Sequence, residues 1–328
     1  MPECNRKGIS AFPAGNHVES HLAAIVHSDS SSLPPAPAPE PPAANLWTLN
    51  FLSYENRTAT RAAPLLFGLF IASQLAAVWT FIWYFFNPTW SAHLAAGPAA
   101  IAVTFLLCSV VLCIGEYLFH RYLLHIETVR FLRPLCSSHL RHHKLTSITF
   151  DETAGKVRSR YPITDVAHDD QSTFPPWALI PFFAFFTPFL APAAFSFPDV
   201  PILIGGYGAI ALAHFLYETI HAVHHQPFEP YWRRRLDHPV FGRAWHWLYG
   251  FHQGHHAFYK CNLNVAGFFG VPLADILFGT YRQPEPLLVD GAEARKDAAR
   301  RLMTQPRWPI SWLDRVVFKR RRWMVKRR

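Results

Sequence analysis

Histidines are the residues of this chain whose number and spacing are best suited to chemistry. The 328-residue sequence has 19 of them, with five between His120 and His143 and nine between His214 and His256. Three five-residue segments have the pattern HxxHH, and an HxxxxH pair precedes them. Because positions i, i+3 and i+4 lie on one face of a helix, the imidazoles of each HxxHH segment are expected to converge.

A metal is the partner that such a set of imidazoles requires, because neutral imidazoles are costly to bury without one. About ten ligands are too many for a single four-coordinate ion, so two ions are expected. Glu218-x-x-His221 is the one match to the carboxylate motif of soluble di-iron proteins, so ligation by histidine alone is favoured. The motif histidines are His120 and His125, then His139, His142 and His143, then His221, His224 and His225, then His252, His255 and His256.

The first pair poses a geometric problem. On an ideal helix, His120 and His125 are five residues apart and point about 140° away from each other. They are therefore expected either to bind different metals or to be separated by a bulge or an end of the helix.

The elements that must position these histidines are apolar helices. Four windows lack Asp, Glu, Lys and Arg: 64–86, 98–115, 175–197 and 201–217. Each has roughly the ~17–25 residues that a membrane-spanning helix needs. The third contains Pro181, Pro188 and Pro192, which predicts a kinked or re-entrant helix. We predict an all-α, polytopic membrane bundle of about four transmembrane helices in two hairpins, with a cytosolic helical cap that holds a His-rich dimetal site.

Charge supplies the expected orientation. The net charge is +9, and the basic residues lie mostly outside the four windows. By the positive-inside rule, the N terminus and segments 119–174 and 218–328 are expected on the cytoplasmic side. Both histidine groups begin near the cytoplasmic end of a predicted span, so charge and chemistry agree on one face. The basic C-terminal run is interpreted as attracted to anionic lipid headgroups and as a topology signal, and no nucleic-acid partner is expected.

The chain is expected to have three parts. Residues 1–46 are rich in Ser, Pro and Ala and predict disorder. Residues 47–282 form the catalytic domain, and 283–328 form a basic C-terminal tail. The five cysteines lack paired spacing, so neither a disulfide framework nor a cysteine-based zinc site is expected.

The motifs together resemble the membrane fatty acid hydroxylase/sterol desaturase superfamily over roughly residues 100–282. Residues 116–125 resemble its opening HxxxxH motif, 139–143 its HxxHH, and 217–225 its HxxxH segment. Residues 252–256, followed by the FGTY tail at 278–281, resemble its closing motif. The resemblance implies that two metals are held by His120, His125, His139, His142, His143, His221, His225, His252, His255 and His256. It implies no catalytic residues beyond these ligands.

The implied activity is hydroxylation of an unactivated C–H bond of a lipid (fatty acyl, sphingoid or sterol) by two non-haem iron ions and O2. The chain lacks a His-Pro-Gly-Gly haem motif, so electrons are expected from a separate donor of the cytochrome b5 or ferredoxin type. The implied location is an integral, multi-pass position in a bacterial inner membrane or the endoplasmic reticulum, with the active site on the cytoplasmic side.

The other histidines and nearby basic residues receive separate interpretations. His224 is an extra imidazole between two expected ligands, and His214 is expected to be buried and hydrogen-bonded within its span. The expected places of His168, His238 and His246 are loops or the surface. Arg121, Arg141 and Lys144 either contact the polar head of a lipid substrate or serve topology and anchoring.

Three alternative functions remain. A carotenoid ring hydroxylase and a lipid desaturase use similar histidine motifs. From another class, a membrane metal transporter with a His-rich cytosolic domain would require ionisable residues inside the spans.

Overall fold

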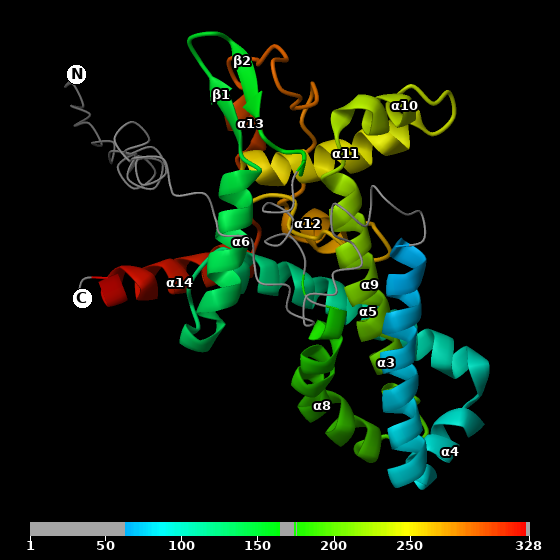
Figure 1. Cartoon of the computed structure of the whole chain (residues 1–328). Helices are drawn as coiled ribbons and strands as arrows, with labels where there is room; N and C mark the ends of the chain where they lie inside the picture. Colours follow the sequence, from blue (N-terminus) through cyan, green and yellow to red (C-terminus); the bar gives the residue numbers. More distant parts are fainter. Residues whose placement is uncertain (1–62, 165–173, 175, 326–328) are drawn as a thin grey trace, which may run out of the picture. The chain divides into compact units, whose positions relative to one another are not determined.

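A computed structural model of the chain describes residues 63–164, 174 and 176–325, with side chains described as far as Phe318 (Figure 1). The chain divides into two compact units, Met1–Leu46 and Trp47–Arg328. All described residues belong to the second unit. The disorder expected for 1–46 and the expected loop position of His168 therefore lie outside the described residues. The second unit continues past 282, and the expected boundary there stays a prediction.

Within the described residues, four helices are long and apolar enough to cross a membrane, which confirms the four predicted windows. They are α3 (Ala63–Phe85), α5 (Gly97–Phe119), α8 (Leu179–Ser196) and α9 (Ile202–His224). The apolar stretch of α5 continues through a π-helical turn, η1 (His120–Leu124), which extends the second candidate span to Leu124. A short helix, α4 (Asn87–Ala95), joins α3 to α5. The arrangement of these helices as two transmembrane hairpins stays a prediction.

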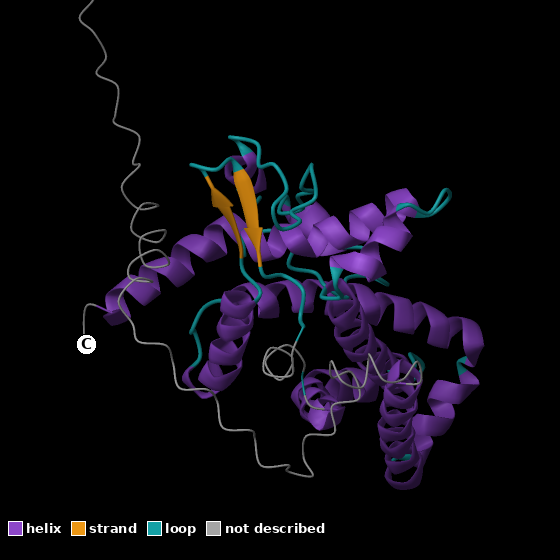
Figure 2. Cartoon of the chain, turned by 45° about the horizontal axis from the view of Figure 1, so that its top comes forward, coloured by secondary structure: helices purple, strands orange, loops and turns teal. Residues whose placement is uncertain are grey.

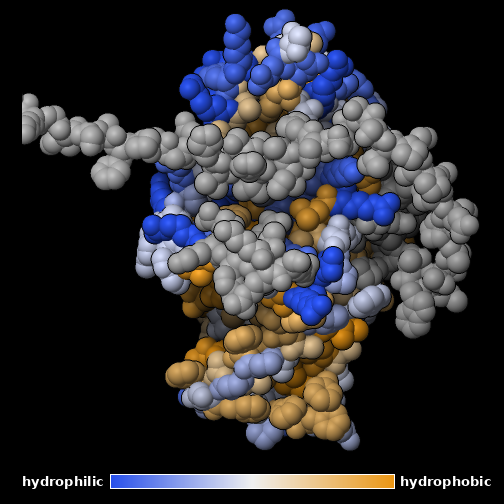
Figure 3. All heavy atoms as spheres, turned by 90° about the vertical axis from the view of Figure 1, so that its left-hand side faces the viewer, coloured by the Kyte–Doolittle hydropathy of each residue, from blue (hydrophilic) through white to orange (hydrophobic). Residues whose placement is uncertain are grey.

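The four long helices differ in what they expose. Most apolar side chains of α3, α5 and α8 face outward, and examples are Leu69, Leu107 and Phe185. Helix α9 is mostly buried, because α3, α5 and α8 all pack against it. Figure 3 shows the result on one face, where apolar atoms form a continuous zone at the bottom and hydrophilic atoms gather at the top. An apolar zone of this kind has no stable place in water and supports a membrane protein.

Small residues let α9 occupy this central position. A Cβ added to Gly205 would lie 2.8 Å from the backbone nitrogen of Phe105 on α5. A Cβ added to Gly206 would meet the side chain of Leu190 on α8 at 3.0 Å. The two glycines therefore allow the backbones of three long helices to approach closely. Helix α8 continues through Pro188 and Pro192 as one element.

The rest of the described chain forms the cap, which we define as residues 120–164 and 225–325. Figure 2 shows it as helices and loops with one small sheet. Its longer helices are α6 (Arg133–Leu145), α11 (Gly242–Ala257) and α14 (Ile310–Val325). Its shorter elements are η2 (Arg130–Leu132), η4 (Phe228–Trp232), α10 (Arg233–Leu236), α12 (Leu273–Phe278) and α13 (Ala298–Leu302). Outside the cap, η3 (Pro176–Ala178) lies just before α8.

The small sheet departs from the all-α prediction. Strands β1 (Ile148–Asp151) and β2 (Lys156–Ser159) form an antiparallel hairpin directly after α6. Ile148 and Val157 are buried against Trp232 and Tyr249 in one apolar cluster of the cap. Each strand has only four residues, so its alternating pattern is too short to distinguish a strand from a loop in the sequence. The hairpin leads from α6 to Tyr161, whose carbonyl contacts the candidate site.

Candidate metal centre

The helices bring all ten histidines implied by the resemblance into two groups. In each group, one ring nitrogen from every member lies within 4.8 Å of the others, so each group could hold a metal ion. All ten are buried except His143, which is half-buried. The first histidine group is His120, His125, His139, His143 and His255. The second histidine group is His142, His221, His225, His252 and His256.

The π-helical turn η1 answers the question posed by the first pair. Its backbone hydrogen bond runs from the nitrogen of His125 to the carbonyl of His120, five residues back, at 3.3 Å. A wider turn brings residues five apart onto one face. The two rings consequently stack with centroids 5.1 Å apart and planes at 9°. The expected bulge is present, and both histidines belong to the first group.

The HxxHH motifs converge as predicted, but they divide between the groups. On α6, His139 and His143 join the first group while His142 joins the second. On α11 the assignment is reversed, since His252 and His256 join the second group and His255 joins the first. In these two motifs the i and i+4 imidazoles share one group, and the i+3 imidazole belongs to the other; in the motif at the end of α9, His221 and His225 share the second group and His224 belongs to neither.

The Nε2 atoms of the first group face one another. That of His139 lies 3.0 Å from that of His120, 3.1 Å from that of His143 and 3.3 Å from that of His125. The Nε2 of His255 lies 3.1 Å from that of His143 and 3.2 Å from that of His125. Five ring nitrogens are therefore directed toward a common point.

Rings of the second group meet at similar distances. The centroid of His142 lies 5.0 Å from that of His221, 4.8 Å from that of His225 and 5.0 Å from that of His256. The Nε2 atoms of His252 and His256 are 3.1 Å apart. The two groups adjoin each other, because the rings of His143 and His256 stack with centroids 4.3 Å apart.

Backbone carbonyls set the tautomers of three rings. The Nδ1 of His120 donates to the carbonyl of Leu263 at 2.6 Å, and the Nδ1 of His255 donates to that of Cys261 at 2.8 Å. In the second group, the Nδ1 of His225 donates to the carbonyl of Tyr161 at 2.8 Å. A carbonyl can only accept, so the Nε2 of each of these rings carries a lone pair.

These lone pairs test whether a metal fits. In the first group, the Nε2 lone pairs of His120 and His255 point into a cluster of further imidazole nitrogens. In the second group, the buried Nε2 of His225 has no hydrogen-bond partner among the described residues. Metal-binding histidines typically donate their other ring N–H to a carbonyl in this way. The donor set and its orientation fit metal cations.

Burial keeps the imidazoles neutral. It lowers the pKa of His139, and the positive charge that His143 and His120 would carry lowers that pKa further, well below 6.5. The same causes, burial first and neighbouring imidazoles second, act on the pKa values of His125, His252 and His256. At neutral pH these rings are deprotonated, and a histidine must be in this form to bind a metal.

A buried polar network supports the loop that contains Cys261 and Leu263, whose carbonyls bind the rings of His255 and His120. Glu116 accepts hydrogen bonds from the backbone nitrogens of Ala266 and Gly267, each at 2.9 Å. Asp275 accepts from the Asn264 nitrogen at 2.7 Å and from the Thr280 hydroxyl at 2.7 Å. Since this loop provides the carbonyls of Cys261 and Leu263, the network orients two rings of the first group.

Most of this network could not be predicted from the sequence. Thr280 lies within the FGTY tail, and this motif was the one feature of the sequence that drew attention to Thr280. Gly279 has a φ of 75° and ends α12 in the left-handed conformation, which returns the chain so that Thr280 reaches Asp275. Asn264 and Glu116 act across 148 to 151 residues of sequence, a separation at which spacing carries no information.

The remaining histidines lie outside both groups. His224 is buried, and its ring stacks on that of His252 with centroids 4.7 Å apart. His214 is buried within α9 between Phe67 and Phe182, but its Nε2 has no hydrogen-bond partner in the described part of the chain. His238 is exposed, and His246 is partly buried on α11.

One interpretation of the nearby basic residues is wrong. Arg121 does not face a lipid headgroup, because its guanidinium pairs with Asp314 at 2.9 and 2.6 Å and donates to the carbonyl of Lys260 at 3.1 Å. Its side chain is only 5% exposed. Arg141 and Lys144 are exposed on α6 and stay available for either expected role.

No family model matches the chain, and neither a curated protein nor a solved structure matches it. The histidine geometry is therefore the main support for a functional assignment.

Proposed function

We propose that this chain is a membrane-bound di-iron oxygenase that hydroxylates an unactivated C–H bond of a lipid with O2. One observation carries the proposal: ten imidazoles from three helices (α6, α9 and α11) and one π-turn (η1) form two adjoining groups where two apolar helices end. Structural metal sites need four ligands, and this arrangement has five potential ligands in each of two groups. An adjoining pair of metals is suited to a reaction that neither ion performs alone.

The choice of iron follows from the donors and the substrate. Imidazole suits Zn, Cu, Fe and Ni, but zinc has no redox chemistry. Iron, when bound, supplies the activation of O2 that oxidation of a saturated carbon demands. The chain's own residues would hold the metals, fix the ring orientations through the carbonyls of Leu263, Cys261 and Tyr161, and keep nine of the ten rings buried away from water. Electrons would come from a separate redox protein.

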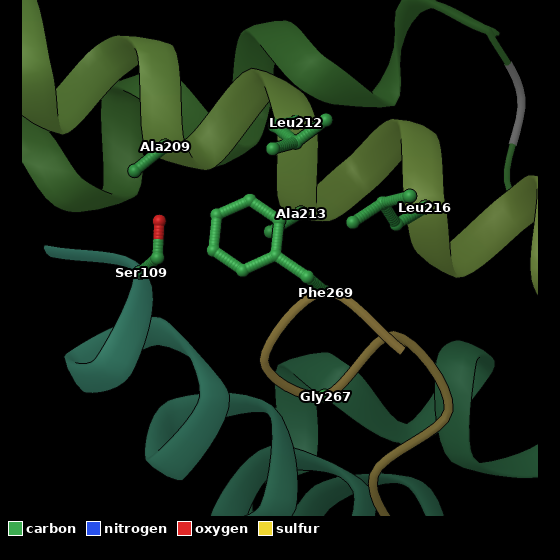
Figure 4. Close-up of a pocket in the computed structure, with 7 residues that line it drawn as sticks. All are labelled: Ser109, Ala209, Leu212, Ala213, Leu216, Gly267 and Phe269. Carbon is green, nitrogen blue, oxygen red and sulfur yellow. The ribbon is translucent and has the colours of Figure 1, made fainter. Parts of the chain in front are cut away.

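A small apolar pocket of about 10 Å³ lies beside the spans; it has room for about one water molecule and not for a lipid chain, so the lipid substrate is proposed from the position of the site at the ends of apolar spans. The pocket lies between α5, α9 and the loop that carries Gly267 and Phe269, and Figure 4 shows the Phe269 ring between the two helices. Ser109 has the only side-chain hydroxyl in the lining, and it donates to the carbonyl of Phe105 at 2.8 Å. Both helices lead from this pocket toward the histidines at their C-terminal ends. The lining residues are Ser109, Ala209, Leu212, Ala213, Leu216, Gly267 and Phe269.

The proposed topology follows the same geometry. Helices α5 and α9 both end in histidines of the site, so both would end at one membrane face. With short connections between α3 and α5 and between α8 and α9, the four spans would form two hairpins. By the positive-inside rule, the basic residues of 119–174 and 218–328 support a cytoplasmic position for that face. A lipid tail would then approach within the bilayer while its polar head stays near the surface.

The proposal is tested by removing ligands from each group. His139→Ala, His143→Ala, His252→Ala and His256→Ala are each expected to abolish the oxidised lipid, measured by mass spectrometry of membranes from expressing cells. His238→Ala is the matched control, because His238 is exposed and lies outside both groups. It should leave the product unchanged.

The same experiment separates the alternatives. A product heavier by one oxygen supports hydroxylation, and a product lighter by two hydrogens supports desaturation. Retained oxidation in His139→Ala, or purified protein that binds metal but consumes no O2 with any membrane lipid, would overturn the proposal. Metal uptake into vesicles without O2 consumption would instead favour transport.

A further inference from the structure

The C-terminal part of the cap exposes large apolar side chains that the metal site does not use. On α12, Ile276 and Leu277 are about half exposed, at 49% and 52%. At the start of α14, Trp308 is 78% exposed and Trp312 is 50% exposed. Val316 follows one helical turn after Trp312, at 47%, so the two lie on the same face of α14. We call Ile276, Leu277, Trp308, Trp312 and Val316 the C-terminal apolar face.

This face lies close to the end of a candidate membrane span. Ile310, at the start of α14, is buried in one cluster with Cys113 and Tyr117 of α5, and Leu313 packs against that cluster. Tyr117 precedes Leu124, where the candidate span ends, by seven residues. The carbonyl of Ile310 also accepts a hydrogen bond from the hydroxyl of Tyr122, two residues before Leu124, so α14 begins within about two helical turns of the end of the span. That position corresponds to the boundary between lipid headgroups and acyl chains.

Helix α14 is held in place rather than free. Asp314 forms the buried ion pair with Arg121, next to His120 on η1. Asp314 also accepts a hydrogen bond from the hydroxyl of Tyr122 at 2.8 Å. The backbone nitrogen of Arg307 donates to the carbonyl of Phe278, which fastens the segment before α14 to α12. Figure 1 shows α14 running across the direction of α3 instead of alongside it.

We propose that α12 and α14 form an in-plane membrane anchor, with the C-terminal apolar face in the lipid boundary and basic residues against anionic headgroups. Arg315 is exposed on α14, and the sequence continues with Lys319, Arg320, Arg321 and Arg322. Tryptophan next to basic residues is typical of helices that lie in this boundary. A lipid surface is the occupant because the position of Ile310 brings this face to the bilayer that the four spans require.

The anchor does not depend on the proposed oxidation. It holds the end of α5, however, and therefore steadies η1 and the first histidine group against the membrane surface.

The experiment compares two exposed valines in the full chain in lipid nanodiscs. Val316→Cys and Val240→Cys are each labelled with the environment-sensitive fluorophore NBD, with the parent chain as the labelling blank. Val240 is the matched control, because it is exposed in the segment between α10 and α11, away from α12 and α14 in sequence. We expect the label at 316 to show blue-shifted emission and loss of intensity with doxyl-labelled lipids, while the label at 240 shows neither.

The partner class is decided by further arms of the same experiment. Replacing part of the phosphatidylcholine by phosphatidylglycerol should increase quenching at 316, because the neighbouring basic residues attract anionic headgroups. A label at 316 that water-soluble iodide quenches as strongly as the label at 240 would overturn the proposal. A label at 316 that neither iodide nor doxyl lipid reaches would show a covering protein, and would overturn it as well.

Discussion

The ion pair between Arg121 and Asp314 provides a direct test of how the cap is joined to the end of α5. The substitution is Asp314→Ala, which removes the carboxylate and keeps the helical propensity of α14. The guanidinium of Arg121 then retains only the carbonyl of Lys260 at 3.1 Å, while its side chain is 5% exposed. A buried charge without its partner is strongly destabilising.

The expected magnitude follows from the burial of the two partners. Breaking a buried pair costs about 3–5 kcal/mol. Asp314 is 17% exposed, so water partly replaces the lost carboxylate, and we expect the lower limit of about 3 kcal/mol. For a domain of this size, that loss lowers the unfolding midpoint by about 6–12 °C.

Two further variants control for other effects. Asp297→Ala removes a carboxylate whose partners, Arg295 and Arg301, are 55% and 54% exposed, so its effect should stay below about 1 kcal/mol. The double variant Arg121→Met with Asp314→Leu removes both charges and should regain most of the stability lost in Asp314→Ala.

The assay is thermal unfolding in nanodiscs, followed by tryptophan fluorescence. If Asp314→Ala unfolds at the same temperature as Asp297→Ala, the pair is not buried as described. If the double variant is less stable than Asp314→Ala, the loss comes from packing rather than from an unpaired charge.

Three other predictions concern the site and its supporting loop. His139→Ala and His255→Ala should weaken the same step of a Co²⁺ titration although they lie in different motifs, and His142→Ala should weaken the other step. In chelator-treated protein, the buried imidazoles have pKa values well below 6.5, while histidines of the unfolded chain have pKa values near ~6.5. The unfolded chain therefore binds more protons as the pH drops below ~6.5, and the unfolding midpoint should fall. Each such imidazole contributes up to about 1.4 kcal/mol per pH unit, and a flat profile down to pH ~5 would contradict buried neutral rings. Gly267→Ala should destabilise the protein by more than about 1 kcal/mol, because φ is 54° and the added Cβ would contact the carbonyl of Val271. Gly291 has a φ of 75° and nothing near the position of a Cβ, so Gly291→Ala should lower the midpoint of thermal unfolding less.

Local patterns were sufficient to predict eleven motif histidines, from the spacing of imidazoles on one helix, and four apolar helices, from runs of residues without charge. The family resemblance selected the ten histidines that meet. Local periodicity also indicated that His120 and His125 could share a site only if the helix departed from α geometry. Periodicity could not decide between a bulge and two separate metals, because the answer depends on which histidines of other helices pack against His120 and His125.

The division of the HxxHH motifs on α6 and α11 between the two groups was beyond prediction for the same reason. Spacing places His139, His142 and His143 on one helix face, but the approach of α11 and the end of α9 decides which ring belongs to which group. Likewise, a basic residue such as Arg121 near the end of a span is typical of a headgroup contact. Its actual partner, Asp314, lies 193 residues later in the sequence. Long-range pairing of this kind leaves no trace in spacing or composition.

The two histidine groups also show how a membrane bundle and a cap can build one site together. Helix α5 with η1 contributes only to the first group, through His120 and His125, and the end of α9 contributes only to the second, through His221 and His225. Helices α6 and α11 each contribute to both groups. If α5 and α9 were the only elements that positioned the two groups, a shift of α5 along α9 would change the distance between them. Because α6 and α11 bridge the groups with crossed i+3 histidines, the cap fixes the distance between the two sites while each span holds one of them at the membrane.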